Sequence, residues 1–166
     1  MDLDSLVQWS AKNALPFNVS KCEKITYSRK TSRDISHVYS LQGQPLHGTD
    51  WVRDLGIIMD RGLTYKLHFQ QAMQKARRHL GFIIRCSRNF ENIQTLLTLY
   101  FALVRPHLEF GMLVWCPTPK NRSKAIETVQ KRFLKFLYYK TFKYYPVDML
   151  YYSWGFRYTP LRKEEE

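Results

Sequence analysis

The 166-residue sequence is poor in cysteine and in long apolar runs. Cys22, Cys86 and Cys116 are odd in number, far apart and outside any CxxC pair, which argues against a disulfide framework and against a zinc site. A reducing intracellular compartment, nuclear or cytoplasmic, is therefore expected. No stretch reaches the ~18 apolar residues that a membrane-spanning helix needs, so we expect no membrane partner. Residues 1–4 do not begin a signal peptide, because no basic region precedes a long apolar run.

Acidic residues are scarce in the second part of the chain. Residues 1–64 carry 8 Lys/Arg and 7 Asp/Glu, a net charge of +1. Residues 65–166 carry 18 Lys/Arg and 7 Asp/Glu, a net charge of +11, and three of those acids are Glu164, Glu165 and Glu166. A part this basic favours a polyanionic partner, and nucleic acid is the usual one. A solubilising surface or a basic patch next to a membrane is the alternative.

The common catalytic patterns are also missing. There is no GxSxG, no HExxH and no glycine-rich phosphate loop. The five histidines are not at metal-ligand spacing, and we interpret them as surface or packing residues. Two-metal nucleotidyl transfer needs clustered carboxylates, but no two aspartates are adjacent. Asp50, Asp54 and Asp60 are more typical of turn caps or surface pairs. We therefore predict no catalytic residue and no metal site.

The first sixty residues combine a helical pattern with strand patterns. Apolar residues at helical spacing predict a helix over 3–15, capped by Asp2 or Asp4 and stopped by Pro16. Short runs rich in β-branched and aromatic residues predict three features of a small antiparallel sheet. They are a strand over 24–29, a hairpin over 38–46 that turns at Gly43, and a strand over 51–59 that is interrupted by Gly56.

From residue 61 onward the apolar period becomes helical. The spacing predicts helices over 69–83, over 93–104 up to Pro106, and over 126–137 with Asn121 and Ser123 as candidate caps, with a shorter apolar segment over 108–115. The predicted fold class is thus α+β, with an N-terminal helix and a small sheet in residues 1–62 and a basic helical bundle in residues 63–166. The change of period coincides with the change of charge.

Two rows of basic residues lie on the predicted helices. Lys75, Arg78 and Arg85 form one row, and Lys124, Lys131 and Lys135 form the other. Such rows can follow a phosphate backbone, although a solvated helix face is the commoner use of a Lys/Arg stripe. Two rows in one small bundle with few acids favour nucleic-acid binding. Three basic residues near the boundary could extend this surface, namely Arg53, Arg61 and Lys66.

A tyrosine-rich segment follows the last predicted helix, from Tyr138 to Trp154. Its rings could stack on nucleobases, or they could pack as an aromatic cap over that helix. We favour the cap, because aromatic side chains bury large areas.

A series of short phrases then runs in one order along residues 2–137. The phrases are Asp4–Ser10, Asn13–Cys22, Ile25–Arg29, Tyr39–Leu41, Val52–Asp60, Leu63–His68, Leu80–Arg85, Leu99–Pro106, Leu108–Phe110, Val114–Pro117, Ile126–Gln130 and Arg132–Lys135. Their order and spacing resemble the reverse transcriptases of non-LTR retrotransposons, in particular the jockey-like kind. The resembling part is the end of the palm, after the catalytic Asp-Asp turn, followed by the thumb.

This resemblance implies roles for individual residues. Lys21 matches a palm lysine thought to act on the pyrophosphate or nucleotide side. Leu55 and Gly56 match the primer grip, a hairpin that holds the 3′ end of the primer. The helices from about residue 65 match the thumb, whose basic faces hold the template–primer duplex of RNA and DNA.

The resemblance also shows what is missing. The Asp-Asp turn, the third metal-binding Asp, the fingers and the endonuclease have no counterpart, and Met1 falls just past the catalytic turn. The expected function is therefore a fragment of an RNA-directed DNA polymerase that grips nucleic acid and is inactive alone. No cofactor is expected in this chain, and Mg²⁺ is expected only for the intact polymerase. The alternatives are a domesticated or degenerate binding module, which could self-associate through exposed palm surfaces, and a subunit whose aspartates come from another chain.

Overall fold

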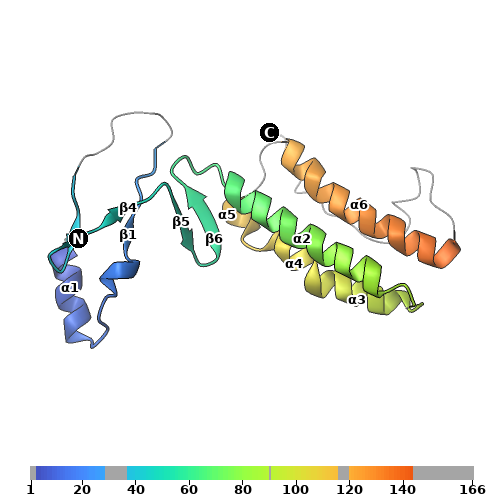
Figure 1. Cartoon of the computed structure of the whole chain (residues 1–166), viewed down its shortest axis with the longest axis horizontal. Helices are drawn as coiled ribbons and strands as arrows, with labels where there is room; N and C mark the ends of the chain where they lie inside the picture. Colours follow the sequence, from blue (N-terminus) through green and yellow to red (C-terminus); the bar gives the residue numbers. More distant parts are fainter. Residues whose placement is uncertain (1–2, 29–36, 90, 116–119, 144–166) are drawn as a thin grey trace, which may run out of the picture. The chain divides into compact units, whose positions relative to one another are not determined.

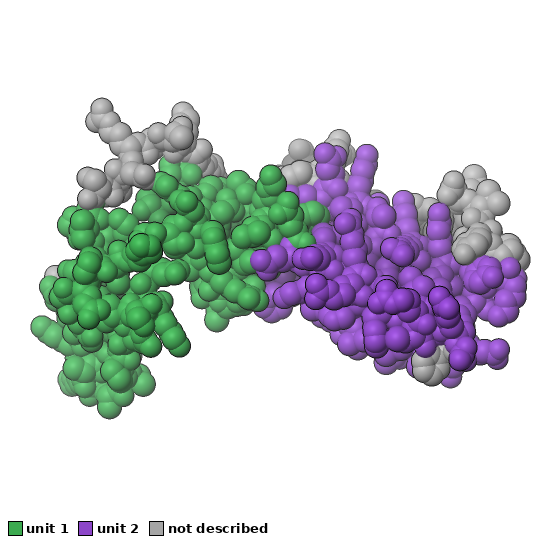
Figure 2. Space-filling model, viewed as in Figure 1, with its two compact units in different colours: residues 1–70 green, residues 71–166 purple. Residues whose placement is uncertain are grey.

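The computed structural model describes residues 3–28, 37–89, 91–115 and 120–143. The chain divides into two compact units, residues 1–70 and residues 71–166 (Figure 2). The first unit holds a helix and short strands, and the second is helical (Figure 1). The predicted α+β class and the predicted order of its elements are confirmed.

Helix α1 (Leu3–Lys12) ends earlier than predicted. Ala14 adopts a left-handed conformation with φ of 54°. The N–H groups of Ala14 and Leu15 donate back to the carbonyls of Ala11 and Ser10, at 3.3 and 3.0 Å. This is the Schellman pattern of helix ends. Pro16 acts indirectly, because a residue before proline is disfavoured in the helical region, so the chain leaves the helix before Leu15.

The strands of the first unit form three separate pairs rather than one sheet. Strand β1 (Glu23–Lys24) pairs with β4 (His47–Gly48) in parallel, so the predicted strand over 24–29 is shorter than expected and not antiparallel. Strands β2 (Ser40–Leu41) and β3 (Gln44–Pro45) form the predicted hairpin around Gly43. The strand predicted over 51–59 with an interruption at Gly56 is two strands, β5 (Trp51–Asp54) and β6 (Ile57–Asp60), which form an antiparallel hairpin, as the resemblance implied for Leu55 and Gly56.

Both hairpins turn through two residues with positive φ. The values are 52° and 74° at Gln42 and Gly43, and 45° and 88° at Leu55 and Gly56. Two left-handed residues in succession give the type I′ turn, whose twist matches that of paired strands. Gly56 therefore reverses the chain, which is why a strand interrupted at this glycine becomes two strands.

Asp60 joins the second hairpin to helix α2 (Lys66–Cys86). Its carboxylate accepts hydrogen bonds from the backbone N–H of Thr64 (3.2 Å), the hydroxyl of Thr64 (3.0 Å) and the backbone N–H of Tyr65 (2.8 Å). Partial burial raises the pKa of Asp60, but these donors outweigh burial and lower the pKa below its ordinary 3.8. The aspartate thus caps a turn, which is one of the roles that the sequence favoured.

The helices of the second unit confirm the predicted bundle. Beside α2 they are α3 (Ile93–Leu103), α4 (Arg105–Glu109), α5 (Met112–Trp115) and α6 (Lys120–Phe142). Asn92 caps α3 by accepting from the N–H groups of Gln94 and Thr95. In Figure 1, α2 and α6 run in one direction and α3 to α5 return between their ends.

The core of the second unit follows the predicted apolar stripes. Tyr100 of α3 stacks on Phe133 of α6, with ring centroids 4.1 Å apart and planes 7° apart. Burial raises the pKa of Tyr100 to about 12, against the Arg105 charge, which lowers it. The core of this unit also contains other buried side chains from its segments: Ala76, Leu80, Ile83, Leu96, Val104, Leu108, Trp115, Ile126, Val129 and Leu137.

Three predicted details of the bundle differ. Helix α3 ends at Leu103, before Pro106 as predicted, but Pro106 also lies in the first turn of α4, where the missing N–H of proline costs nothing. Helix α6 begins at Lys120, so Asn121 and Ser123 lie inside its first turn and are not caps. Of the tyrosine-rich segment, Tyr138 is buried and Tyr139 exposed on α6, and residues 144–154 lie outside the described residues.

We predict that Asp60→Ala lowers the free energy of unfolding by about 1–2 kcal/mol at pH 7, because it removes a capping acceptor. Since the folded pKa lies below the unfolded one, the carboxylate stabilises above pH ~3.8 and the effect disappears as pH falls through the folded pKa. Urea unfolding between pH 7 and pH 3 measures the loss of stability and its dependence on pH. Asp60→Asn keeps one acceptor oxygen, so its free energy of unfolding should fall by about half as much as that of Asp60→Ala. Equal stability of wild type and Asp60→Ala at pH 7 would contradict this role.

Candidate nucleic-acid interface

One face of α6 carries one of the two predicted basic rows. Lys124, Lys131 and Lys135 are all exposed, and their spacing of seven and four places them within one narrow stripe. The opposite stripe of the same helix holds buried Val129 and Phe133. Packing of the apolar stripe therefore holds the three ammonium groups outward.

A single acidic residue touches this row among the described contacts. The Glu127 carboxylate lies 4.0 Å from the ammonium of Lys131, one helical turn away. Exposed pairs of this kind contribute only a few tenths of a kcal/mol, about 0.3–0.5. The hydroxyl of Thr128 donates to the carbonyl of Lys124 (2.8 Å) and adds no charge. The row keeps most of its positive field.

The second row lies on α2. Lys75, Arg78 and Arg85 are exposed. Arg78 and Arg85, seven residues apart, lie opposite the buried Leu80 and Ile83, while Lys75 lies on a neighbouring flank. The structure therefore brings Arg78 and Arg85 onto one face and sets Lys75 beside it.

A histidine pair packs next to Lys75. His79 of α2 stacks on His107 of α4, with ring centroids 4.8 Å apart and planes 16° apart. Burial lowers the pKa of His107, and the His79 and Lys75 charges lower it further. The Nδ1 atom of His79 is buried without a hydrogen-bond partner among the described residues. The geometry supports the interpretation of these histidines as packing residues.

His68 has a packing role in the first unit. It is buried, and its Nδ1 accepts a hydrogen bond from the backbone N–H of Ile58 (3.3 Å). This contact fixes the start of α2 against β6.

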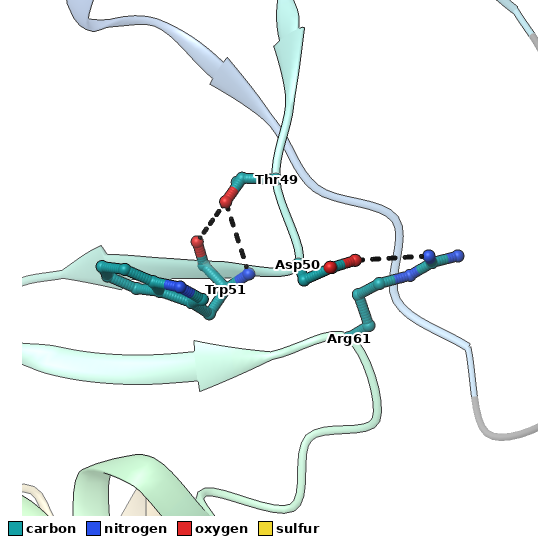
Figure 3. Close-up of polar contacts among 4 residues, drawn as sticks. All are labelled: Thr49, Asp50, Trp51 and Arg61. Atoms are coloured by element: carbon teal, nitrogen blue, oxygen red, sulfur yellow. Dashed lines mark hydrogen bonds and ion pairs between the residues drawn. The ribbon is translucent and has the colours of Figure 1, made fainter.

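The candidate residues of the first unit lie on three elements. Lys21 is exposed at the end of the 3₁₀ turn η1 (Val19–Lys21), where its backbone N–H donates to the carbonyl of Asn18 (3.0 Å). Arg53 is exposed on β5, and Lys66 is exposed as the first residue of α2. The guanidinium of Arg61 forms an ion pair with the carboxylate of Asp50, at 3.4 Å between nitrogen and oxygen (Figure 3). Arg53 shares its hairpin with Leu55 and Gly56.

Leu55 and Gly56 form the tip of the β5–β6 hairpin. Leu55 is 87% exposed although it is apolar and has a positive φ. A left-handed conformation costs a non-glycine residue about 1–2 kcal/mol, and burial does not compensate for this cost here. An exposed apolar side chain in a strained turn is a typical feature of a contact site.

Several exposed residues near these sites do not follow the patterns that predicted the candidate residues. Arg77, Arg88 and Arg132 are exposed beside the two basic rows, but they fall outside the strict helical spacing that defined those rows. Trp51 is half-exposed on β5. The sequence offered one indication of it, because side chains two apart on a strand share a face, and Trp51 and Arg53 are two apart.

The described part of the chain offers no metal site. Within it, no three His, Cys, Asp or Glu side chains are grouped so that they could hold an ion. Asp50 instead pairs with Arg61, and Asp60 caps the turn before α2. No described helix is long and apolar enough to cross a membrane.

Three relatives found by comparison with known proteins are polymerases of mobile elements. The chain is 24% identical over 135 residues to an RNA-directed DNA polymerase from the mobile element jockey of Drosophila funebris, and 26% identical over 136 residues to the one of Drosophila melanogaster. Both alignments cover 80% of this chain. A probable RNA-directed DNA polymerase from the transposon X-element of Drosophila melanogaster is 22% identical over 127 residues, 75% of this chain.

The chain is therefore distantly homologous to the reverse transcriptases of jockey and X-element non-LTR retrotransposons. It spans 14% of the length of each of these three relatives. No family model matches the chain. No solved structure matches it either.

We predict that Leu55→Asn stabilises the β5–β6 hairpin by about 1 kcal/mol, because asparagine tolerates the left-handed conformation and Asn-Gly is the favoured type I′ pair. Amide hydrogen exchange across β5 and β6 should slow accordingly. Gly56→Ala is the control, and it should accelerate exchange because alanine disfavours a φ of 88°. Unchanged exchange in Leu55→Asn would show that the turn is not strained.

Proposed function

We propose that this chain is a nucleic-acid-gripping fragment of a non-LTR retrotransposon reverse transcriptase. Residues 1–62 would be the end of the palm, and residues 63–166 the basic thumb and connection region. The exposed lysine row on α6, in a chain homologous to RNA-directed DNA polymerases, carries this proposal. Its partner is the duplex of RNA template and DNA primer.

Phosphate contacts explain how the helical rows would work. A Lys or Arg that neutralises a phosphate releases counterions, so each contact adds affinity that depends on salt. Such contacts position a duplex without reading its sequence, as a polymerase that moves along a template requires. The contacting residues would be Arg53, Lys66, Lys75, Arg78, Arg85, Lys124, Lys131 and Lys135.

The hairpin and η1 take more specific roles in this proposal. Leu55 and Gly56 would form the primer grip, where an exposed apolar tip and a side-chain-free glycine approach the end of the primer. Lys21, exposed at the end of η1, would face the nucleotide or the leaving pyrophosphate. Its role needs the nucleotide site of the intact polymerase.

The chemistry itself would come from residues that these 166 do not include. Two-metal phosphoryl transfer needs carboxylates that hold both ions, and the sequence contains no Asp-Asp pair. In the proposed function Mg²⁺ belongs to the intact polymerase, and this chain holds the substrate duplex. The chain alone would bind nucleic acid without extending a primer.

One observation favours a second candidate, a protein-interaction module. Leu113 of α5 is 98% exposed, and Phe110 and Val114 beside it are also exposed. Exposed apolar clusters are typical of protein contacts, including self-association. This candidate predicts that the basic rows contribute nothing specific, so the following variants separate it from the first.

We predict that changing Lys124, Lys131 and Lys135 together to Gln weakens binding to an RNA–DNA hybrid. If each lysine neutralises one phosphate, the slope of log affinity against log salt should fall by about 3. Fluorescence anisotropy between 50 and 200 mM salt measures this slope.

The matched control changes the same three lysines to Arg, which keeps the charge and should keep the slope. A triple Gln variant with the wild-type slope would exclude the α6 row as the interface and favour the interaction module.

A further inference from the structure

Trp51 is the largest exposed side chain of the β5–β6 hairpin. The structure leaves 50% of its surface exposed. In Figure 3 the indole extends along the strand and away from the Asp50–Arg61 ion pair. About half of the indole surface is therefore accessible to a ligand.

Thr49 fixes the backbone from which this indole projects. The Thr49 hydroxyl donates to the carbonyl of Trp51 (2.8 Å) and accepts from its backbone N–H (3.4 Å; Figure 3). On the other side of the strand, the backbone N–H of Arg61 donates to the carbonyl of Asp50 (3.1 Å). A ring on a fixed backbone loses little conformational freedom when a ligand binds, which favours affinity.

Arg53 lies on the same face of β5 as Trp51. Side chains two apart on a strand share a face and stand about 7 Å apart. In the β5–β6 register, Trp51 is opposite Asp60 and Arg53 is opposite Ile58. Arg53 is exposed. A flat aromatic surface and a guanidinium, which binds phosphate with two parallel hydrogen bonds, therefore stand side by side.

We propose that Trp51 and Arg53 form a subsite for single-stranded nucleic acid. The indole stacks on one unpaired nucleobase, and the guanidinium binds the phosphate next to that base. The base must be unpaired, because the bases of a duplex cover their faces by stacking on each other. This inference rests on the proposed function, since the nucleic-acid partner comes from the homology to RNA-directed DNA polymerases.

Two labelled probes test the subsite on the full chain. One is a (dT)₁₂ oligonucleotide, and the other is a blunt 12-base-pair RNA–DNA hybrid, which offers no unpaired base. Trp51→Ala should weaken (dT)₁₂ binding by about 5- to 150-fold, the range of one base–aromatic stack. It should leave hybrid binding within about twofold. Arg53→Gln should lower the salt slope for (dT)₁₂ by about 0.7, the value for one phosphate of a single strand.

Matched variants guard against an effect on folding. Trp51→Phe keeps an aromatic face and should retain most of the (dT)₁₂ affinity. Trp9→Ala removes an equally exposed tryptophan (54%) on α1 and should leave (dT)₁₂ affinity unchanged. Quenching of tryptophan fluorescence by (dT)₁₂ should be smaller in Trp51→Phe than in wild type and unchanged in Trp9→Phe.

The subsite is overturned if Trp51→Ala binds (dT)₁₂ as well as wild type, or if quenching in Trp51→Phe is as large as in wild type. If the wild-type chain binds the hybrid under the same conditions, the proposed function is still supported. Failure of the wild-type chain to bind either probe would overturn both proposals.

Discussion

The packing of α6 against α3 determines where the charge of the second unit lies. Phe133 stacks on Tyr100, and the apolar stripe that contains Phe133 is buried along the helix. Because one turn takes 3.6 residues, burial of this stripe turns Lys124, Lys131 and Lys135 to the opposite side. The hydrophobic core thus arranges the candidate phosphate-binding row without any contact among the lysines themselves.

The first unit depends instead on turns. Two type I′ turns reverse the chain, and Asp60 holds the connection from β6 to α2 with three hydrogen bonds. Strand pairs this short bury little surface, so such turns and caps carry a large share of their stability. They also leave three side chains of the hairpin exposed, namely Leu55 at its tip and Trp51 and Arg53 on β5.

The sequence predicted the helices well because their apolar period is long and regular, as from Phe69 to Ile83. It predicted the strands less well. Gly56 was interpreted as an interruption, since a positive φ at Leu55 is not expected of leucine and gives no signal in the residue type. The end of α1 was placed at Pro16, although a left-handed Ala14 ends it earlier. Lysine rows were predictable from spacing alone, whereas Trp51 was identified as a candidate only after β5 was seen to place it, exposed, on the same strand face as Arg53.

In the proposed function, the outward face of α6 contacts a nucleic-acid duplex. Lysine acetylation followed by mass spectrometry, with and without a saturating RNA–DNA hybrid, tests it most directly. Contact predicts that Lys124, Lys131 and Lys135 are protected several-fold while Lys12, exposed at the end of α1, reacts at the same rate. Equal reaction of all four lysines in the presence of bound hybrid would contradict the claim.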